Sequence, residues 1–517
     1  MDKKSDLNAY IAVLDDAISP RESPDGKDSL IIKAYQYFQD RLDKLPPVEG
    51  ENTKAILELL DKVNRATLVK MDVGSYSDAY TLFESLNNRG LELTGVDIIK
   101  SKLFAKLEEK GGADSIEGYS RKWEQLLDCL GDDYNIQERF FRHYYNAFNK
   151  PKTTVGSEDD GKQHTNEIAT RSNLVRLYEK LIEGCAEEFL HNIMSAGDLY
   201  SFIIGRVEHP KLVKPLSDLD HIQGTPSYLL LLYLFWHKEH LDLSDERDGH
   251  LYKIINNLVS FFVRRNLTDF PSTNKLARLF MGMVEEIEKN GLTGEDIVNR
   301  INNKLKSESS SDETFKNSLE GPVYLENADV VRFILCSLEE KESGREKWPL
   351  WRMERKHYIW TIEHIFPQGK DIPPSWIGMM GEGNEAKAKE LQKSHVHLLG
   401  NLTITGYNSN LGNKSFIEKR DRKDSEGRSV GYRNGLHLNI DLLNGDEWTK
   451  ARIEERTKRL VAETLDLFPL RNKIEDLANI KSKKYDPMDR FFLDPDSIVI
   501  IKKGDEKGKD GKPADVT

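Results

Sequence analysis

The chain has 517 residues and a mass of 59.4 kDa, and its 75 basic and 87 acidic side chains give a net charge of −12. This balance excludes a protein that coats nucleic acid through bulk positive charge, so DNA binding would need a local patch or a metal ion. Three distant cysteines (Cys129, Cys185 and Cys336) exclude a disulfide framework, and the apolar run 228–236 is too short for a bilayer, which predicts a cytoplasmic protein without a membrane segment.

Helical periodicity dominates the first hundred residues. Apolar residues on one face predict a helix over 31–45, and Asn52 or Thr53 is the expected cap of a second helix. Thr94 is the expected N-cap of a third helix, which should end at the glycine pair 111–112. At about 150 residues per domain, the whole chain is long enough for about three domains.

The helical pattern continues through the middle of the chain. Helices are predicted over 117–150 and 173–205, with a polar loop over 151–168 between them. Thr225 followed by proline predicts the start of a buried helix. An apolar stripe over 251–262 predicts a further amphipathic helix.

Composition changes twice in the second half of the chain. The polar stretch 307–321 predicts a linker, after which a helical pattern returns over 329–339. From Trp348, short apolar runs alternate with glycine, proline and asparagine, a texture typical of a small α+β unit. A long helix is expected over 447–467, and the polar end of the chain, 504–517, is expected to be disordered.

The residues that suggest chemistry lie in three segments, TIEHIFPQ (361–368), HLLGNLTIT (397–405) and GYNSNLGNKSF (406–416). They are Glu363 and His364, then Asn401, then Asn408, Asn410, Asn413 and Lys414. Hydrolysis of a phosphodiester needs a base for water, an offset for phosphate charge and a Lewis acid for the leaving oxygen. One imidazole with carboxylate and amide oxygens on a divalent ion would supply these, and oxygen ligands favour Mg²⁺ or Mn²⁺ over zinc.

The spacing of these segments predicts how they meet. A strand ending at His364, a second strand near 402–405 and a helix from about Ser409 would place the three segments on one side of a hairpin and helix. This arrangement would bring the imidazole, the amides and the carboxylate to one site.

Each residue also has an ordinary structural interpretation. A histidine before a turn is commonly a strand-end residue, Asn401 after glycine is a common turn residue, and asparagine-rich runs commonly form turns and caps. His395 and His397 flank Val396, so one of them can face the core and the other a site. A structural role is the favoured interpretation for His395.

The run from EHIFPQ to VHLLGNLTITGYNSNLGNKSFIEKR resembles the His-Asn-Asn nuclease domain of the GmrSD-type, modification-dependent (type IV) restriction enzymes. Trp376 and the segment 447–469 match the same pattern, and the resemblance covers about 330–470. The site of that family belongs to the HNH, or ββα-metal, nucleases. The resemblance therefore implies a small α+β HNH-like domain after a multi-helix module, in a mainly α chain.

Carried over by position, the resemblance implies catalytic roles for His364, Asn401 and Asn408. His364 would be the general base, Asn401 would hold the loop that orients it, and Asn408 would lie near the metal and the scissile phosphate. The implied ligands of Mg²⁺ or Mn²⁺ are Glu363, His364, Asn408 and Asn410, with Asn413 competing for the last asparagine role.

DNA contacts are expected from a basic run in an otherwise acidic chain. Lys414, Lys419 and Arg420 are the predicted phosphate contacts, and Arg422 and Lys423 continue the run. The competing interpretation is that these are solvated surface side chains.

A second resemblance covers the front of the chain, where 79–104 and 260–280 are similar to the companion domain of the same family. That domain opens with a ParB-like section carrying Asp-Gly-Gln-Gln-Arg, whereas no Asp-Gly pair here is followed by Gln-Gln-Arg. The expectation is therefore that the chain begins after this section and does not hydrolyse nucleotide alone. The chain could be the downstream product of a split gene, in which case a separate nucleotide-binding subunit supplies the section, or a truncated copy or piece of the enzyme. Residues 87–90 could face a nucleotide or form a polar turn, so the nucleotide-binding residues are unknown.

Four parts are expected along the chain. They are 1–110, the helical remainder of the family's N-terminal domain; 111–325, a helical middle region; 326–472, the nuclease domain; and 473–517, a partly disordered extension. The implied function is a metal-dependent DNA endonuclease that restricts foreign, phage DNA bearing modified bases, acting as a homodimer. The alternatives are a non-catalytic regulatory or interaction subunit of a split restriction complex and, less favoured, a nuclease directed at RNA.

Overall fold

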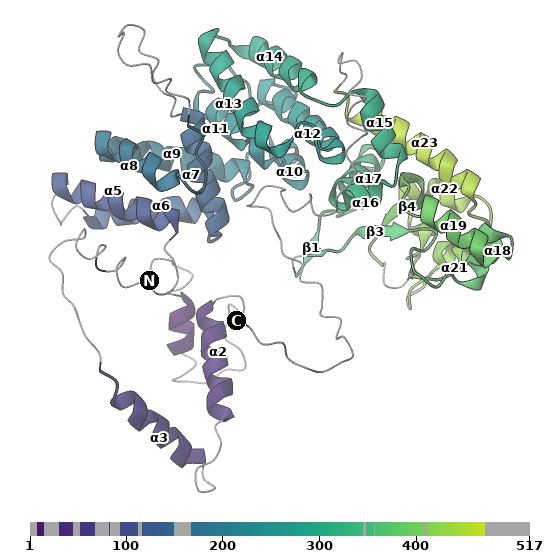
Figure 1. Cartoon of the computed structure of the whole chain (residues 1–517), viewed down its shortest axis with the longest axis horizontal. Coiled ribbons are helices and arrows are strands. Elements are labelled where there is room, and N and C mark those ends of the chain that lie inside the picture. The colour runs from purple at the N-terminus through teal and green to yellow at the C-terminus, as the bar shows by residue number, and fades with distance from the viewer. Residues whose placement is uncertain are drawn as a thin grey trace, which may run out of the picture. The chain divides into compact units, whose positions relative to one another are not determined.

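A computed structural model of the chain describes residues 8–14, 30–44, 52–67, 82, 94–111, 116–148, 167–344, 348–355, 357–407 and 411–470. These residues are mainly helical, with two small two-stranded sheets near the C-terminal end (Figure 1). The predicted fold class, a mainly α chain with a small α+β unit, is confirmed. The predicted disordered end of the chain and most of the predicted loop 151–168 lie outside the described residues.

Contacts divide the chain into two units, residues 1–142 with 169–198 and residues 143–168 with 199–517. The helices of the first unit are α2 (Leu30–Asp43), α3 (Asn52–Asn64), α5 (Gly95–Gly111), α6 (Ile116–Leu130) and α8 (Leu174–Gly184). Helices α7 (Tyr134–Phe148) and α9 (Ala186–Ile203) begin in the first unit and end in the second. The expected division into four parts rests on sequence patterns and stays a prediction.

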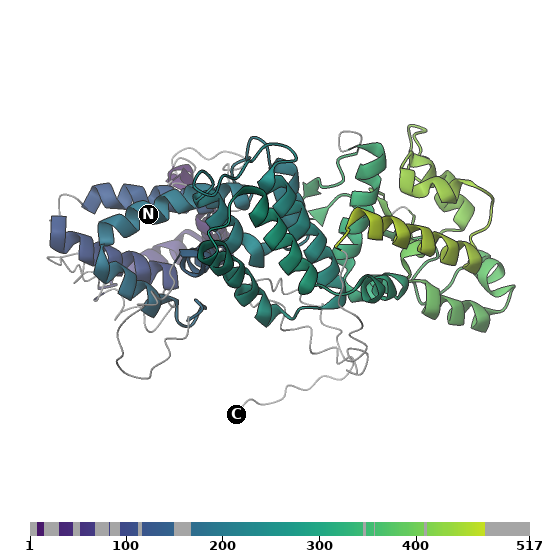
Figure 2. The ribbon, with the colours of Figure 1, turned by 90° about the horizontal axis from the view of Figure 1, so that it is seen from above.

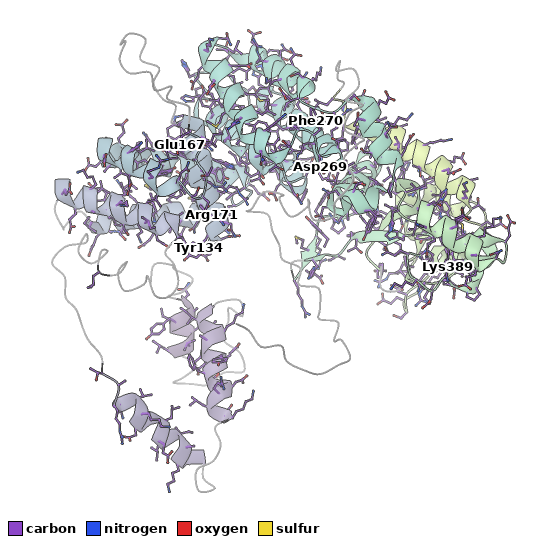
Figure 3. All side chains as sticks on the ribbon, in the orientation of Figure 1. Tyr134, Glu167, Arg171, Asp269, Phe270 and Lys389 are labelled. Carbon is purple, nitrogen blue, oxygen red and sulfur yellow. The ribbon has the colours of Figure 1, made fainter. Side chains whose placement is uncertain are left out.

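The second unit contains the remaining helices. Those before the first sheet are α10 (Val213–His221), η2 (Thr225–Ser227), α11 (Tyr228–Trp236), α12 (His250–Thr268), α13 (Thr273–Lys289), α14 (Gly294–Ser307), α15 (Asp312–Glu320), α16 (Val323–Glu326) and α17 (Ala328–Ser343). Around the second sheet lie α18 (Pro374–Gly381), α19 (Glu385–His395), η3 (Leu399–Asn401), α21 (Phe416–Asp421), η4 (Tyr432–Asn434), η5 (His437–Asn439), α22 (Ile440–Leu443) and α23 (Lys450–Leu467). Side chains fill the spaces between these helices, and Lys389 marks the exposed face of α19 (Figure 3).

Local sequence signals account for several helix boundaries. Thr94 precedes α5 as expected: its hydroxyl accepts from the backbone N–H of Asp97 at 3.2 Å, and the Asp97 carboxylate accepts from the backbone N–H of Thr94 at 3.1 Å. This reciprocal pair satisfies two backbone groups that a helix start leaves open. Helix α3 begins at Asn52 and α23 lies within the predicted 447–467, so both predicted helices are present. The predicted cap at Asn52 or Thr53 stays a prediction, because Asn52 is already inside the helix.

The predicted linker over 307–321 is wrong. Helix α15 occupies most of it, and the Ser311 hydroxyl caps the helix by accepting from the backbone N–H of Thr314 at 3.1 Å. Phe315 and Leu319 are fully buried. The polar composition of this stretch therefore belongs to a cap and an exposed face, because two apolar residues four positions apart suffice to bury a short helix.

Both sheets are antiparallel hairpins. Strand β1 (Met353–Glu354) pairs with β2 (His357–Tyr358), and β3 (Thr361–His364) pairs with β4 (Leu402–Thr405). The long connection between β3 and β4 carries α18, α19 and η3, and α21 follows β4. The expected pair of strands is therefore present with a helix behind it, which is a ββα arrangement.

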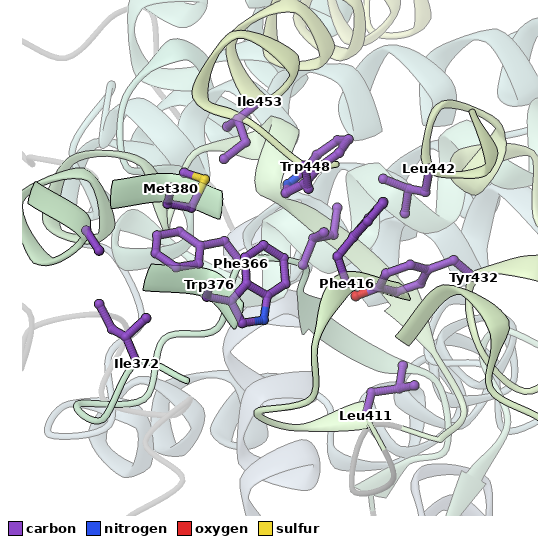
Figure 4. Packing of buried hydrophobic residues seen from close by; sticks show 12 residues of the cluster. Phe366, Ile372, Trp376, Met380, Leu411, Phe416, Tyr432, Leu442, Trp448 and Ile453 are labelled. Carbon is purple, nitrogen blue, oxygen red and sulfur yellow. The ribbon is translucent and has the colours of Figure 1, made fainter. Parts of the chain in front are cut away.

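An apolar cluster holds this ββα unit together (Figure 4). Its members are Ile365, Phe366, Ile372, Trp376, Met380, Ala388, Leu411, Phe416, Tyr432, Leu442, Trp448 and Ile453. Helix α23 lies against η3, at the start of β4, and its full length is visible across the C-terminal part of the second unit in Figure 2. The cluster joins the residues after β3 to α18, α21 and α23, so it fixes the chain on both sides of the candidate site.

Two absences hold for the described part of the chain. No described helix has the length and apolar character needed to cross a membrane. Each of the three cysteines is a free thiol, as the sequence predicts.

Candidate active site

His364 ends β3 and faces away from Glu363. Neighbouring residues of a strand point to opposite faces, and the register pairs His364 with Leu402 and Glu363 with Thr403. Both side chains are buried, with exposed fractions of 6% for His364 and 4% for Glu363. The two residues that the sequence placed at one metal site therefore lie on opposite faces of the hairpin.

Asn401 holds the chain on both sides of the site. Its amide nitrogen donates to the carbonyl oxygens of Phe366, at 3.0 Å, and Val396, at 2.9 Å. Its amide oxygen accepts from the backbone N–H of Phe366, at 2.9 Å, and from the Trp448 indole N–H, at 3.1 Å. With no exposure to solvent, Asn401 acts as a clamp on the loop after His364, which is the role that the resemblance implied.

A second histidine lies beside His364. The Nε2 atom of His364 is 3.3 Å from Nδ1 of His397, and the ring of Tyr324, from α16, contacts both imidazoles. The Tyr324 ring meets His364 edge-on at 4.6 Å between centroids and stacks on His397 at 5.4 Å. His395 faces elsewhere, with Nδ1 2.7 Å from the Ser394 hydroxyl. His395 is therefore structural, as favoured from the sequence, and His397 is the histidine that faces the site.

Burial keeps both facing imidazoles neutral. Burial, with smaller contributions from His397 and Lys419, lowers the pKa of His364 from 6.5 to about 3. Burial also lowers the pKa of His397. A neutral imidazole carries one N–H and one lone pair, so at neutral pH one ring nitrogen of His364 keeps an unprotonated lone pair.

On the opposite face, Glu363 forms a buried ion pair with Lys419 of α21. The Lys419 ammonium donates to the Glu363 carboxylate at 2.6 Å and to the carbonyl oxygens of His364 and Ile365 at 2.8 and 3.1 Å. Burial raises the pKa of Glu363 and lowers that of Lys419, while their mutual attraction opposes both shifts. The hydroxyl of Tyr432 lies beside the same carboxylate, where it lowers the pKa of Glu363 less than Lys419 does. Burial and this carboxylate raise the pKa of Tyr432 itself.

This placement corrects the predicted role of Lys419. An ammonium has three donors, and all three are directed at Glu363 and at two backbone carbonyls. Lys419 is also fully buried, so it has neither an open face nor a spare donor for a DNA phosphate. We assign it a structural role at the end of β3.

Arg420 is corrected for the same reason. Its guanidinium donates to Asp421, to Asp446 at 2.7 Å and to the carbonyl oxygen of Gly445, and only 7% of the residue is exposed. Arg422 and Lys423, which follow in the sequence, are exposed. The basic run is therefore divided by the fold, and its exposed members follow α21.

The asparagine-rich segment is only partly described. Asn408 and Asn410 lie outside the described residues, so their predicted roles stay predictions. Asn413 is exposed and lies against Gly369, at which a Cβ atom would come within 3.1 Å of the Asn413 amide. Lys414 is half-buried, and its carbonyl oxygen accepts from the Trp376 indole N–H at 2.8 Å.

Helix α21 of the ββα unit starts at Phe416, where Ser415 and Glu418 form a capping box. The start predicted near Ser409 lies outside the described residues, and Leu411, the first described residue after it, is helical. The Ser415 hydroxyl accepts from the backbone N–H of Glu418, and the Glu418 carboxylate accepts from the backbone N–H of Ser415 at 2.9 Å.

Two comparisons with known families match this chain. The model of the C-terminal domain of GmrSD restriction endonucleases matches residues 309–463, which include the whole ββα unit and His364. The model of the GmrSD restriction endonuclease N-terminal domain matches residues 2–104. The chain belongs to the GmrSD restriction endonuclease family. A search of curated proteins finds no match.

Family membership supports a restriction nuclease role with DNA as substrate. The N-terminal match extends over 2–104, a longer stretch than the 79–104 segment that carried the resemblance in the sequence. The C-terminal match places His364, Asn401 and His397 within one GmrSD domain.

The predicted metal ligands of this GmrSD chain fit a divalent ion only in part. Glu363 faces Lys419 instead of His364, and Asn408 and Asn410 are outside the described residues. Within the described ranges, no group of three or more histidine, cysteine, aspartate or glutamate side chains is placed to hold a metal ion. The described residues therefore form an imidazole site and a buried ion pair, and they do not by themselves form a metal site.

Sequence reasoning named one further residue of the site as an option and missed another. His397 carried a signal, because it lies four positions before Asn401 in the same segment and either it or His395 could face a site. Tyr324 carried none, since α16 lies forty residues before His364 and only the fold brings the two rings together.

Proposed function

We propose that this GmrSD chain is an HNH-type DNA endonuclease in which His364 is the general base. The observation that carries the proposal is the placement of a neutral imidazole at the end of β3 in a ββα unit. Asn401, Lys419 and the apolar cluster hold the chain that presents this imidazole. A base held rigidly in one geometry is what proton abstraction from a water molecule requires.

The proposed reaction is hydrolysis of a DNA phosphodiester. His364 takes a proton from water, the water oxygen forms a bond to phosphorus, and the P–O bond to the leaving oxygen breaks. The leaving oxygen keeps the electron pair of that bond and takes a proton from solvent. The role of Asn401 is to position the base, because every polar atom of its side chain is occupied by the fold.

Metal dependence is part of the proposal. Bound Mg²⁺ or Mn²⁺ would supply a Lewis acid for phosphate and leaving-group charge. Asn408 and Asn410 are the residues that we propose to hold it, together with phosphate oxygens of the substrate. Glu363 is left out of this set because Lys419 neutralises it, and His364 is kept as a base because its Nε2 faces His397.

The substrate and partners follow from family membership as proposals. The DNA is proposed to be phage DNA with modified bases, contacted through Lys414 and through the exposed Arg422 and Lys423. A separate subunit is proposed to supply the nucleotide-binding section, and a homodimer is proposed to cut both strands.

The test uses the full chain with two substrates. Supercoiled plasmid reports DNA cleavage, and bis(p-nitrophenyl) phosphate reports phosphodiester hydrolysis without DNA recognition. With Mg²⁺ or Mn²⁺ the chain should hydrolyse both substrates, and EDTA should abolish both reactions. His364→Ala should lower the rate by about 100-fold or more, the contribution of a positioned general base.

The competing function is a non-catalytic interaction subunit. The absence of hydrolysis of either substrate with either ion would favour it. Equal rates for the wild type and His364→Ala would instead remove His364 from the mechanism. The imidazole pair weighs against this alternative, because a site without chemistry has no need for a buried neutral histidine that faces a second, half-buried histidine.

A further inference from the structure

We propose that His397 is a positioning residue that fixes the tautomer of His364, so that Nδ1 of His364 is the nitrogen that accepts the proton from water. This inference rests on the proposed function, since it assigns a partner to the proposed base. It concerns a residue that neither the sequence pattern nor the family match assigned to the site.

The first argument is the contact between the two rings. His364 Nε2 and His397 Nδ1 lie 3.3 Å apart, which is within hydrogen-bond distance. A hydrogen bond between two neutral imidazoles needs one N–H and one lone pair, so only two arrangements exist. His364 donates Nε2–H and keeps a lone pair on Nδ1, or His397 donates Nδ1–H and His364 then carries its own proton on Nδ1.

Only the first arrangement leaves His364 with a ring nitrogen that can accept a proton. In the second, the Nε2 lone pair of His364 is used by His397 and Nδ1 is already protonated, so neither nitrogen can take a proton from water. In the first, protonation of Nδ1 gives an imidazolium whose Nε2–H bond to His397 becomes charge-assisted and stronger. Because burial lowers the pKa of His397, that ring is neutral and has no charge to repel the imidazolium. Its acceptor nitrogen therefore stabilises the charge that the reaction creates, as the orienting member of a catalytic triad does.

The second argument is that the fold holds His397 against His364 from several sides. Tyr324 stacks on the His397 ring, with 9° between the planes, and its backbone N–H lies 3.4 Å from the His397 carbonyl oxygen. Asn401 donates to Val396, immediately before His397, and to Phe366, two residues after His364. One side chain thus ties together the two segments that carry the histidines.

The third argument is the contrast with His395. That residue is two positions away in the same segment, but it faces Glu454 at 3.3 Å and Ser394 at 2.7 Å. It offers a matched control: the same residue type in the same segment, which is buried but does not contact His364.

The test compares three variants of the full chain. His397→Leu removes the acceptor, and His397→Asn restores an acceptor because its Oδ1 occupies the position of Nδ1. His395→Gln is the control. Hydrolysis of bis(p-nitrophenyl) phosphate with Mn²⁺ should show kcat reduced about 10–100-fold in His397→Leu with little change in KM, the size typical for residues that orient a reacting group. His397→Asn should recover most of the kcat, and His395→Gln should match the wild type.

A spectroscopic readout separates positioning from folding. Nitrogen-15 NMR of the histidine rings, recorded without metal, should show His364 with its proton on Nε2 in the wild type and in His397→Asn. In His397→Leu this preference should be lost. If His397→Leu does not fold, the kcat and the ring spectrum of His397→Asn still decide the matter.

The outcomes distinguish the two levels of the argument. An active wild type with an inactive His364→Ala, and full kcat in His397→Leu, would overturn the role of His397 and leave the proposed function standing. A His364 proton found on Nδ1 in the wild type would also overturn it. Equal activity of the wild type and His364→Ala would instead overturn the proposed function, and the inference with it.

Discussion

At the scale of single residues, neighbouring polar side chains of a motif have separate roles. Glu363 and His364 are adjacent in the sequence and were assigned to one metal site, but strand alternation sends them to opposite faces. The alternation itself was predictable. The partner of Glu363 was not, because Lys419 is fifty-six positions later and looked like one member of an exposed basic run.

The first prediction concerns this ion pair. Lys419→Met should lower the free energy of unfolding by about 3–5 kcal/mol, because it leaves the Glu363 carboxylate buried without a partner. The double variant Glu363→Gln, Lys419→Met should recover part of that loss, since no charge is then left unpaired. Urea unfolding of the three proteins measures both effects.

Lys414→Met is the control for this pair, because Lys414 is half-buried and has no ion pair within the described part of the chain. It should change stability little. Lys419→Met with wild-type stability but weakened DNA binding would restore the original assignment of Lys419 as a phosphate contact.

The second prediction is a pH dependence from His364. Its pKa is lowered by burial from 6.5 to about 3, so below pH 6.5 the unfolded chain binds a proton that the folded chain does not. Stability should therefore fall as the pH drops from 6.5 toward 3, by up to about 1.4 kcal/mol per pH unit from this group. The difference in unfolding free energy between the wild type and His364→Gln, measured in EDTA across this range, isolates the effect.

Tyr324→Ala provides the matched comparison. It removes a ring whose centroid is 4.6 Å from that of His364, and water should then reach the imidazole. Because burial is the main cause of the lowered pKa, His364 should titrate at higher pH in this variant, which NMR can follow. An unchanged titration would mean that Tyr324 does not shield the base.

At the scale of elements, the sequence predicted both strands of the candidate site. Strand β4 covers the predicted 402–405 and β3 ends at His364, because apolar alternation marks both strands. The capping box of Ser415 and Glu418, which starts α21, was not predicted, since the asparagine-rich run before it suggested caps at several other positions. The linker expected over 307–321 failed because composition does not show which residues of a polar stretch are buried.

For Asn401, the sequence suggested that the side chain holds a loop, but it did not show which residues the side chain binds. The resemblance implied that it holds a loop, whereas its bond to Trp448 joins residues on either side of α21. Long-range partners of this kind depend on the packing of the apolar cluster, which a single sequence does not specify (Figure 4).

The third prediction tests how closely η3, which precedes β4, packs against α23. A Cβ atom at Gly400 would overlap the carbonyl oxygen of Ile453 and the hydroxyl of Thr457, and would lie 2.6 Å from the backbone nitrogen of Thr457. The neighbouring atoms are largely backbone and have no room to move. Gly400→Ala should therefore destabilise the chain by about 1–3 kcal/mol or more, as an overpacked core does, with loss of activity, measured by thermal unfolding and plasmid cleavage.

Gly378→Ala is the control for this substitution. Gly378 is exposed in α18 and a Cβ atom there would meet nothing within 4 Å, so alanine should leave stability unchanged or raise it slightly. Equal stability of the two variants would show that α23 is not held as closely to η3 as the structure places it.

At the scale of the whole molecule, the sequence predicted the mainly helical class and the position of the small α+β unit. The helical class follows from the helical periodicity before Trp348. The position of the α+β unit follows from the short apolar runs and turn residues after it. The boundary between the two compact units at 168–169 lies at the end of the predicted polar loop, whereas the boundaries at 142–143 and 198–199 lie inside α7 and α9. A boundary inside a helix gives no local sequence signal, so these two could not be predicted from composition.

The fourth prediction concerns how one chain cuts two strands. The chain contains one EHIFPQ motif, and the proposed HNH-type site would hydrolyse one phosphodiester at a time, so a single chain should nick DNA. With supercoiled plasmid and Mn²⁺, nicked circles should appear first, at a rate proportional to enzyme concentration. Linear DNA should appear with a steeper, roughly second-order dependence, because the proposed homodimer brings a second site to the opposite strand. Linear product that rises in direct proportion to enzyme, with no nicked intermediate at low concentration, would show that a pre-assembled complex or one chain cuts both strands, and the proposal of concentration-dependent dimerisation would then be withdrawn.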